Sequence, residues 1–320
     1  MLFFSSAAIA FLFAFLIWKQ GFRFSLVDIP NARSSHAHPT PRGGGLGIAV
    51  SVLIYGLMLV NNNWLALIIF AMGVLGFLED IFSLSTMLRL IIQLTLSILM
   101  VYITLGAPHT PVEILLFIFW CIFLTATANF YNFMDGINGI AGVTGVLSFL
   151  FMAFYAFLGA MQYDCALLAV ILCGACAGFL PLNFPKGKVF MGDVGSLLLG
   201  FAFAFMVMKM STSVGTFMCL SMFLCTFYAD SFVTIYYRFS LGESLTQAHR
   251  RHLYQYMSNE LAMPHWKVTL LYGVVQIIVG FIALYLIRDT LAWQVALFTG
   301  FSILFIATYY LIKRIPKKIS

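Results

Sequence analysis

Amide and acidic side chains recur at a fixed interval in the segment N-F-Y-N-F-M-D-G-I-N-G, residues 129–139. Asn132, Asp135 and Asn138 are three residues apart, so they fall roughly on one face wherever the segment is helical. Two amides and an acid on one face can bind a base or the hydroxyl pattern of a sugar. A polar stripe that packs between helices is the ordinary alternative.

A second polar segment, N-F-P-K-G-K-V-F-M-G-D-V-G-S at residues 183–196, brings lysines and an acid close to a glycine. Lys188 can neutralise a phosphate, Asp193 can bind a metal ion, and the ring of Phe190 can stack on a flat base. Asn183 opens the segment. The alternative is a basic loop followed by an acid that stabilises a helix N-terminus.

Adjacent carboxylates, Glu79 and Asp80, stand at the end of an apolar run. Carboxylates at membrane depth are costly and usually functional. A pair of them suits Mg²⁺, which takes hard oxygen ligands and bridges phosphate groups. An acid that only ends a helix is the alternative.

Cations gather in two further segments. Residues 28–45, D-I-P-N-A-R-S-S-H-A-H-P-T-P-R-G-G-G, place Arg42 before three glycines whose backbone N–H groups can approach a phosphate closely. Residues 248–255, A-H-R-R-H-L-Y-Q, hold a dense cluster of cationic side chains suited to anion contact or proton transfer. For both, the alternative is a basic loop beside a membrane.

These segments together supply acids for a divalent metal ion, cations for phosphate, and amides with an aromatic ring for a base. Phosphoryl transfer needs that combination, because its catalysis is mostly positioning and charge neutralisation. The elements that carry the segments must therefore deliver all of them to one place.

The composition shows what those elements are. Of 320 residues, 62% are hydrophobic and 9% are charged, whereas a soluble domain carries about a quarter charged residues. In lipid, a single segment can satisfy all its backbone hydrogen bonds only as a helix, and a helix that spans the membrane needs about 20 residues. We expect one all-α polytopic membrane domain over residues 1–320, with about eleven transmembrane helices at 2–18, 44–60, 64–78, 87–105, 112–130, 139–159, 164–182, 194–211, 214–237, 268–287 and 291–312.

Charge placement predicts the orientation. Of the 17 Lys and Arg residues, all but Lys209 and Arg288 lie on the same side as residues 19–43 when the helices alternate. Loops rich in Lys and Arg stay cytoplasmic. We therefore expect a periplasmic N-terminus, a cytoplasmic C-terminus, and all the polar segments on the cytoplasmic loops.

These segments, in this order, resemble the polyprenyl-phosphate N-acetylhexosamine-1-phosphate transferases, glycosyltransferase family 4, over residues 28–255. N-F-M-D-G-I-N-G and F-M-G-D-V-G-S are the most specific motifs. The runs H-R-R-H-L-Y-Q and S-S-H-A-H-P-T-P-R-G-G-G look more like the branch that initiates lipopolysaccharide and O-antigen than like the peptidoglycan branch.

The resemblance implies transfer of GlcNAc-1-phosphate, or of a related sugar such as a 6-deoxy one, from a UDP-HexNAc to undecaprenyl phosphate, with release of UMP. It implies Mg²⁺, with Mn²⁺ as a substitute, and a role in O-antigen or capsule synthesis at the bacterial inner membrane. It implies membrane lipids and a second copy in a homodimer as partners, and no nucleic acid.

Residue roles follow by position in the family's motifs. The resemblance implies that Asp193 and Asp80 bind the metal ion, and that Asp80 also activates the lipid phosphate. The expected catalytic residues are Asp80, Asp193, His249 and Glu79. The expected substrate-binding residues are Arg42, Asn132, Asp135, Asn138, Asn183, Lys188, Phe190, Arg250 and His252.

Two points stay open. The family usually has two aspartates where this chain has Glu79 and Asp80, which leaves the role of Glu79 unassigned. The rival class is a transporter, since a transporter places ionisable groups near the bilayer midplane. Asp230 is the acid that lies well inside an expected helix, and we expect it to pack between helices or to line a polar space near the inner end.

Overall fold

The computed structural model describes residues 1–23, 26–30, 35, 38–59, 63–244 and 250–316. All eleven apolar runs are helical, as predicted, because lipid leaves the backbone no other hydrogen-bond partners. Among the described residues, ten helices are long and apolar enough to span a membrane, and Leu46–Leu59 is a shorter apolar helix. The chain is an all-α multi-pass membrane protein.

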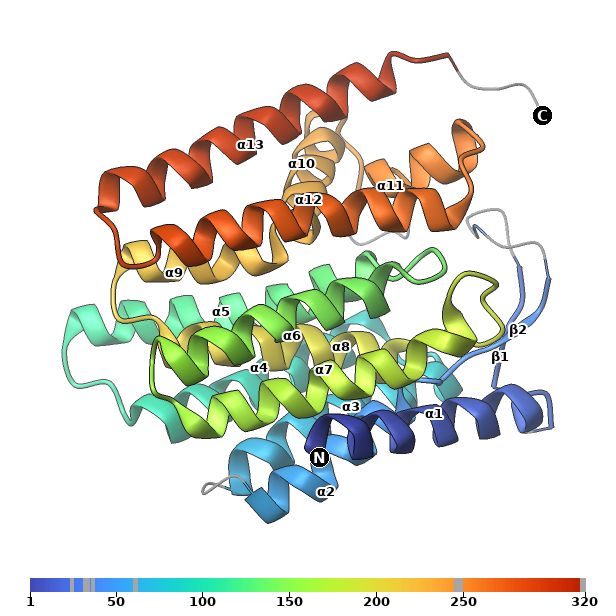
Figure 1. The fold of residues 1–320 in the computed structure, drawn as a ribbon, viewed down its shortest axis with the longest axis horizontal. Helices are drawn as coiled ribbons and strands as arrows, with labels where there is room; N and C mark the ends of the chain where they lie inside the picture. Colours follow the sequence, from blue (N-terminus) through green and yellow to red (C-terminus); the bar gives the residue numbers. More distant parts are fainter. Residues whose placement is uncertain (24–25, 31–34, 36–37, 60–62, 245–249, 317–320) are drawn as a thin grey trace.

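The chain forms two short strands and thirteen α-helices, with a 3₁₀ turn and a π-helical turn, within the described ranges (Figure 1). Their bounds are α1 Leu2–Gln20, β1 Val27–Asp28, β2 Thr40–Pro41, α2 Leu46–Leu59, α3 Asn63–Phe82, α4 Thr86–Leu105, α5 Pro111–Phe133, α6 Ile140–Leu158, α7 Tyr163–Asn183, α8 Asp193–Met210, α9 Val214–Ser221, the 3₁₀ turn Met222–Leu224, α10 Cys225–Ser240, α11 Leu253–Gln255, the π-helical turn Tyr256–Glu260, α12 His265–Leu286 and α13 Leu291–Lys313.

Helix α8 is the centre of the bundle. In its span, 89% of the residues are buried inside the protein, against 11% in α13. Helices α3 and α5 make the most extensive contacts with α8. A helix that is apolar all round and fully enclosed is the axis on which the others pack. The start of α8 is therefore a fixed point for any site built at that end.

The run at 214–237, predicted as one helix, is bent. A 3₁₀ turn at Met222–Leu224 separates α9 from α10, and Figure 1 shows that α10 leaves the direction of α9. The turn exposes the backbone carbonyl of Phe223 to other donors, and Gln276 and Ser148 each donate to it at 2.8 Å. Side chains that enter a helical ladder in this way cause bends.

The polar segments gather at one end of the bundle. Strands β1 and β2 pair antiparallel, with Val27 opposite Pro41 and Asp28 opposite Thr40. Figure 1 shows the strands and α11 at the same end, where α13 also finishes. The short strands extend the chain between α1 and α2 and bring Arg42 to this end.

Candidate active site

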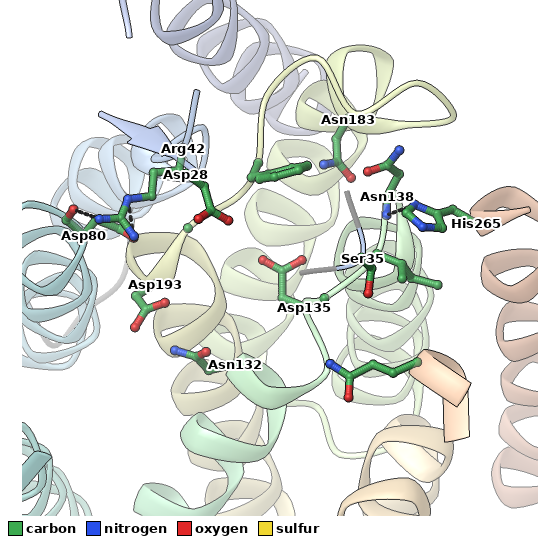
Figure 2. Close-up of a pocket in the computed structure, with 15 residues that line it drawn as sticks. Asp28, Ser35, Arg42, Asp80, Asn132, Asp135, Asn138, Asn183, Asp193 and His265 are labelled. Carbon is green, nitrogen blue, oxygen red and sulfur yellow. Dashed lines mark hydrogen bonds and ion pairs between the residues drawn. The ribbon is translucent and has the colours of Figure 1, made fainter. Parts of the chain in front are cut away.

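A polar cavity of about 190 Å³ lies at this end of the bundle. Its walls come from the β1–β2 segment, the ends of α3 and α5, the loop before α8, α11 and the start of α12. Figure 2 shows side chains from these elements turned toward a common space. The predicted site residues that line it are Arg42, Asp80, Asn132, Asp135, Asn138, Asn183, Phe190 and Asp193.

Asp80 joins three elements. Its side chain is almost fully buried, and its Oδ2 accepts the backbone N–H of Val194 at 3.2 Å, in the first turn of α8. The Nε of Arg42 lies 3.9 Å from its Oδ1, and Arg42 also donates to the backbone carbonyl of Asp80. A carboxylate at a helix N-terminus stabilises the exposed N–H groups. Asp80 thus fixes the start of α8 while lining the cavity.

Glycines allow this approach. A Cβ on Gly76 would lie 2.2 Å from the carbonyl oxygen of Asp193, and a Cβ on Gly45 would lie 2.5 Å from the Cα of Gly195. Helix α3 and the start of α2 can therefore touch the backbone of α8 directly.

Two of the three glycines that follow Arg42 use their backbone N–H groups within the protein, whereas the sequence predicted that these groups bind a phosphate. Gly44 donates to the carbonyl of Phe190 at 2.9 Å, and Gly45 donates to the carbonyl of Met191 at 2.8 Å. These two groups hold the α2 segment against the loop before α8, so they are not available to a phosphate. The prediction that the backbone N–H groups of Gly44 and Gly45 contact a phosphate is therefore wrong.

Glu79 does not line the cavity. Its Oε1 lies 3.5 Å from Arg89, and its Oε2 accepts the backbone N–H of Leu84 at 2.8 Å. The same Arg89 nitrogen lies 3.6 Å from Oδ2 of Asp193. The arginine therefore links the two carboxylates, and the longer side chain of Glu79 is turned away from the cavity toward α4.

Asp135 stands in the middle of the cavity (Figure 2). Burial raises the pKa of its carboxyl well above the usual range, and the charges of Asp193 and Asp80 raise this pKa further. No donor among the described residues forms a hydrogen bond to its carboxylate. Asp80 and Asp193 thus face the same space as Asp135 and repel its charged form.

A divalent cation would relieve that repulsion. Within the described ranges, no three His, Cys, Asp or Glu side chains are close enough to form a complete metal site. Mg²⁺ does not need one, since it is usually bound by one or two carboxylates together with substrate phosphates and water. The donor set of hard carboxylate and amide oxygens fits Mg²⁺ with a phosphate-bearing ligand.

The amides do not share a helical face as predicted, because α5 ends at Phe133. Asn132 lies beside Asp193, at the end of α5, and the turn that follows carries Asp135 and Asn138 into the same cavity (Figure 2). The Oδ1 of Asn183 accepts the N–H of Gly139 at 2.7 Å. This bond ties the α5–α6 loop to the end of α7.

Other predicted site residues lie elsewhere. The Nζ of Lys188 sits 4.7 Å from the ring centre of Trp18, and Arg250 pairs with Glu260 at 3.3 Å. His252 is buried, with its Nδ1 3.4 Å from the carboxylate of Asp230. None of the three lines the cavity. His249 falls outside the described residues.

Asp230 is a packing residue, which agrees with the first of the two expectations for it. Its oxygens accept the backbone N–H groups of Leu253 at 2.8 Å and Tyr254 at 3.2 Å, and the hydroxyl of Tyr272 at 2.7 Å. A fully buried carboxylate is stable when donors surround it in this way. Asp230 therefore anchors α11 to α10 and α12.

Sequence reasoning missed four polar side chains that line the cavity, namely those of Asp28, Ser35, Gln255 and His265. Asp28 and Gln255 end two of the polar segments, so their positions carried a weak signal. His265 gave none, because it reaches the site through a contact with a distant segment: its Nδ1 lies 3.4 Å from the backbone nitrogen of Asn138.

The central helices resemble a known family. The model of glycosyl transferase family 4 matches residues 63–211, which run from the first residue of α3 through the whole of α8. Over these residues, a little under half of the chain, the protein matches glycosyl transferase family 4.

Curated relatives carry consistent names. The chain is 28% identical over 209 residues to a decaprenyl-phosphate N-acetylglucosaminephosphotransferase of Mycolicibacterium smegmatis, which covers 56% of this chain and 52% of the relative. It is 28% identical over 217 residues to an undecaprenyl-phosphate alpha-N-acetylglucosaminyl 1-phosphate transferase of Salmonella typhimurium, covering 62% and 59%. The matches thus span little more than half the length of these relatives.

Some of the residues that line the cavity lie inside the part matched by family 4 and others lie outside it. Asp80, Asn132, Asp135 and Asp193 lie inside the matched residues, so three of the four aspartates of the cavity belong to the part that resembles the family. Gln255 and His265, which line the cavity from α11 and α12, lie outside the match.

Proposed function

We propose that this protein transfers an N-acetylhexosamine 1-phosphate from a UDP-sugar to undecaprenyl phosphate and releases UMP. The observation that carries the proposal is the cavity itself, in which four aspartates, Arg42 and several amides meet at the end of a membrane-spanning bundle. The names of the relatives support a polyprenyl-phosphate acceptor and an N-acetylglucosamine-phosphate donor.

In the proposed reaction, an oxygen of the lipid phosphate attacks the phosphorus that bears the sugar. A new phosphorus–oxygen bond forms, and the bond to the bridging oxygen of UMP breaks, so that UMP leaves with that oxygen and its electron pair. The charge that must be neutralised is concentrated on the diphosphate. Arg42 is the cationic side chain that lines the cavity among the described residues, and it is placed to share that charge.

For Mg²⁺ we propose Asp193 and Asp80, which meet at the first turn of α8. The ion would supply charge neutralisation on the diphosphate. Asp135, whose carboxylate faces them, is placed to orient a substrate hydroxyl or amide group. Phe190, which also lines the cavity, is the ring that we propose stacks on uracil.

The acceptor needs a place for its hydrocarbon chain. An apolar cavity of about 410 Å³ lies between α5, the bent α9–α10 unit and α13, with almost entirely apolar walls. Helix α5 joins the two sites, since Phe130 lines the apolar cavity and Asn132, two residues later, lines the polar one. We assign the apolar cavity to the part of the polyprenyl chain nearest the phosphate.

We place the polar end on the cytoplasmic side of the bacterial inner membrane, because the Lys and Arg residues concentrate there. A product made at that face would begin a surface polysaccharide such as O-antigen or capsule. The transporter alternative loses its main support, since Asp230 is occupied in anchoring α11.

The test is release of UMP by the purified protein in detergent micelles. Reactions contain undecaprenyl phosphate, Mg²⁺ and one UDP-sugar from a panel of GlcNAc, GalNAc, FucNAc and QuiNAc donors. We expect release with at least one donor, and we expect it to stop when the lipid is omitted or EDTA is added. Asp193→Asn and Asp80→Asn should each lower turnover about 100-fold or more.

Two controls make the result decisive. The variants must elute from size-exclusion chromatography as the wild type does, so that loss of activity is not loss of fold. Absence of UMP release with every donor would overturn the proposal. Counterflow of a sugar nucleotide in proteoliposomes without any covalent product would replace it with transport.

A further inference from the structure

Two lysines from distant parts of the sequence lie on the same indole ring. The Nζ of Lys19 is 4.4 Å from the ring centre of Trp18, and the Nζ of Lys188 is 4.7 Å from it. Lys19 belongs to the last turn of α1, whereas Lys188 belongs to the loop between α7 and α8. Figure 1 shows both segments at the end of the bundle where β1 and β2 lie. The two cations therefore become neighbours only in the folded protein.

No carboxylate of the described residues balances these cations, since neither lysine forms an ion pair there. The indole stabilises each ammonium group, but two like charges beside one ring still repel each other. Both lysine side chains are exposed, so an anion from outside can reach them together. A phosphate group between them would remove the repulsion and accept hydrogen bonds from both.

The surroundings indicate where that anion comes from. In the span of α1, 22% of the residues are buried inside the protein, so most of this helix faces the lipid. A tryptophan near the end of a spanning helix lies at the headgroup level of the membrane, and lysines there extend toward the water. Phospholipid phosphates occupy the same level, and basic sites between spanning helices bind anionic headgroups.

The net charge of the headgroup matters as well. A choline or ethanolamine headgroup carries its own cation, which would lie close to the two lysines and offset the attraction of the phosphate. A glycerol headgroup leaves the phosphate charge uncompensated. The pair of lysines therefore favours an anionic phospholipid over a zwitterionic one.

The loop that carries Lys188 also carries Phe190, which lines the polar cavity. The backbone N–H of Lys188 donates to the carbonyl of Leu182 at 2.8 Å, and that of Phe190 donates to the carbonyl of Pro41 at 2.8 Å. Val189, between them, is fully buried. Lys188 and Phe190 thus belong to one short, anchored segment, with the lysine outside the cavity and the aromatic ring in its wall. A lipid that holds Lys188 would restrict the position of Phe190.

We propose that Lys19, Trp18 and Lys188 form a binding site for the headgroup of an anionic phospholipid, and that the bound lipid steadies the loop that carries Phe190. The binding site goes beyond the proposed function and does not require it. The effect of the lipid on a UDP-sugar in the cavity does rest on the proposed function.

The first experiment measures lipid binding by native mass spectrometry, with equal amounts of phosphatidylglycerol and phosphatidylcholine added to the purified protein. Wild type should retain phosphatidylglycerol in preference. Lys19→Gln/Lys188→Gln should lose about fivefold in affinity for phosphatidylglycerol for each lysine removed. Lys19→Arg/Lys188→Arg should keep the preference, because both charges remain.

Lys186→Gln/Lys267→Gln is the matched control, since it removes the same charge. Lys186 belongs to the same loop as Lys188. Lys267 also lies on an indole, 5.5 Å from the ring centre of Trp266, but among the described lysines it lies there alone. This pair should retain phosphatidylglycerol as wild type does. All variants should melt at the wild-type temperature in phosphatidylcholine, so that a loss of lipid is not a loss of fold.

The second experiment measures UMP release in nanodiscs of phosphatidylcholine, with and without phosphatidylglycerol. The KM of wild type for the UDP-sugar should fall about fivefold when phosphatidylglycerol is present. The KM of Lys19→Gln/Lys188→Gln should be the same in both membranes.

Each other outcome overturns a specific part. Equal loss of phosphatidylglycerol in both glutamine pairs would indicate general attraction to the basic face, and no loss in either pair would leave the site without a role. Binding of glycerol 3-phosphate as strongly as phosphatidylglycerol would identify a site for a soluble anion instead. If the lipid binds as expected but KM does not respond, the coupling to Phe190 is overturned and the site stands. If wild type releases no UMP in any membrane, the proposed function fails, and the lipid measurement still decides the site.

Discussion

Two neighbouring carboxylates, Glu79 and Asp80, have different surroundings. Asp80 is buried between Arg42 and the first turn of α8, whereas Glu79 faces Arg89 outside the cavity. Glutamate in place of the aspartate usual in the family therefore has a physical account. Its extra methylene lets the carboxylate reach both the arginine and the N–H of Leu84.

Arg89 couples Glu79 to Asp193, and this coupling is measurable. We expect Glu79→Gln and Arg89→Gln each to lower kcat/KM about tenfold. In Arg89→Gln, Asp193 loses its arginine partner. In Glu79→Gln, Arg89 remains but is no longer held beside Asp193 by the Glu79 carboxylate. The double variant should be no worse than the poorer single variant. A double-mutant cycle on UMP release measures this.

A second readout separates positioning from folding. Binding of Mn²⁺, followed by electron paramagnetic resonance, should weaken in the Arg89 variant while the melting temperature changes little. If the two single losses multiply in the double variant, Glu79 and Arg89 act independently and the coupling is refuted.

At the scale of elements, the site depends on close contact between α3 and α8. Gly76→Ala should lower the melting temperature and abolish most of the activity, because the added Cβ would lie 2.2 Å from the backbone carbonyl oxygen of Asp193. Overpacking of this kind costs about 1–3 kcal/mol or more. Gly300→Ala is the control, since a Cβ there meets nothing within 4 Å. Equal stability of the two variants would contradict the packing argument.

Helix α11 has three residues and is too short to be stable alone, so it should depend on Asp230, which accepts two of its backbone N–H groups. Asp230→Ala should loosen it, because two backbone N–H groups and the Tyr272 hydroxyl lose their common acceptor. Amide hydrogen exchange in residues 253–260 should speed up about tenfold or more. Asp289→Ala, at an exposed helix end, serves as the comparison and should leave that exchange unchanged.

The limits of sequence reasoning also appear at this scale. Apolar runs predicted the helices well, because lipid enforces them regardless of neighbours. The bend at Met222–Leu224 was missed, since it depends on Gln276 and Ser148, which lie far away in the sequence. Lys188 and Arg250 were expected at phosphate, and nothing in their own segments revealed Trp18 and Glu260 as partners.

At the scale of the whole molecule, motif order predicted which acids and amides converge, because alternating helices return the chain to one end. It did not predict the opposite wall. Gln255 and His265 reach the cavity through contacts with Phe133, Tyr254 and Asn138 that only the folded bundle creates. The acids and amides of the site were therefore predictable from the sequence, while the wall formed by α11 and α12 was not.

Orientation is the remaining property of the whole molecule, and charge placement predicts it. We expect Ala107→Cys to react with a membrane-impermeant thiol reagent in intact cells, because residues 106–110 connect helices at the end opposite the cavity. Lys186→Cys, beside the cavity, should react only after permeabilisation. The described native cysteines are all buried, so the background should be low. Labelling of Lys186→Cys in intact cells would place the cavity on the outside, away from cytoplasmic nucleotide sugars, and the proposed reaction would lose its donor.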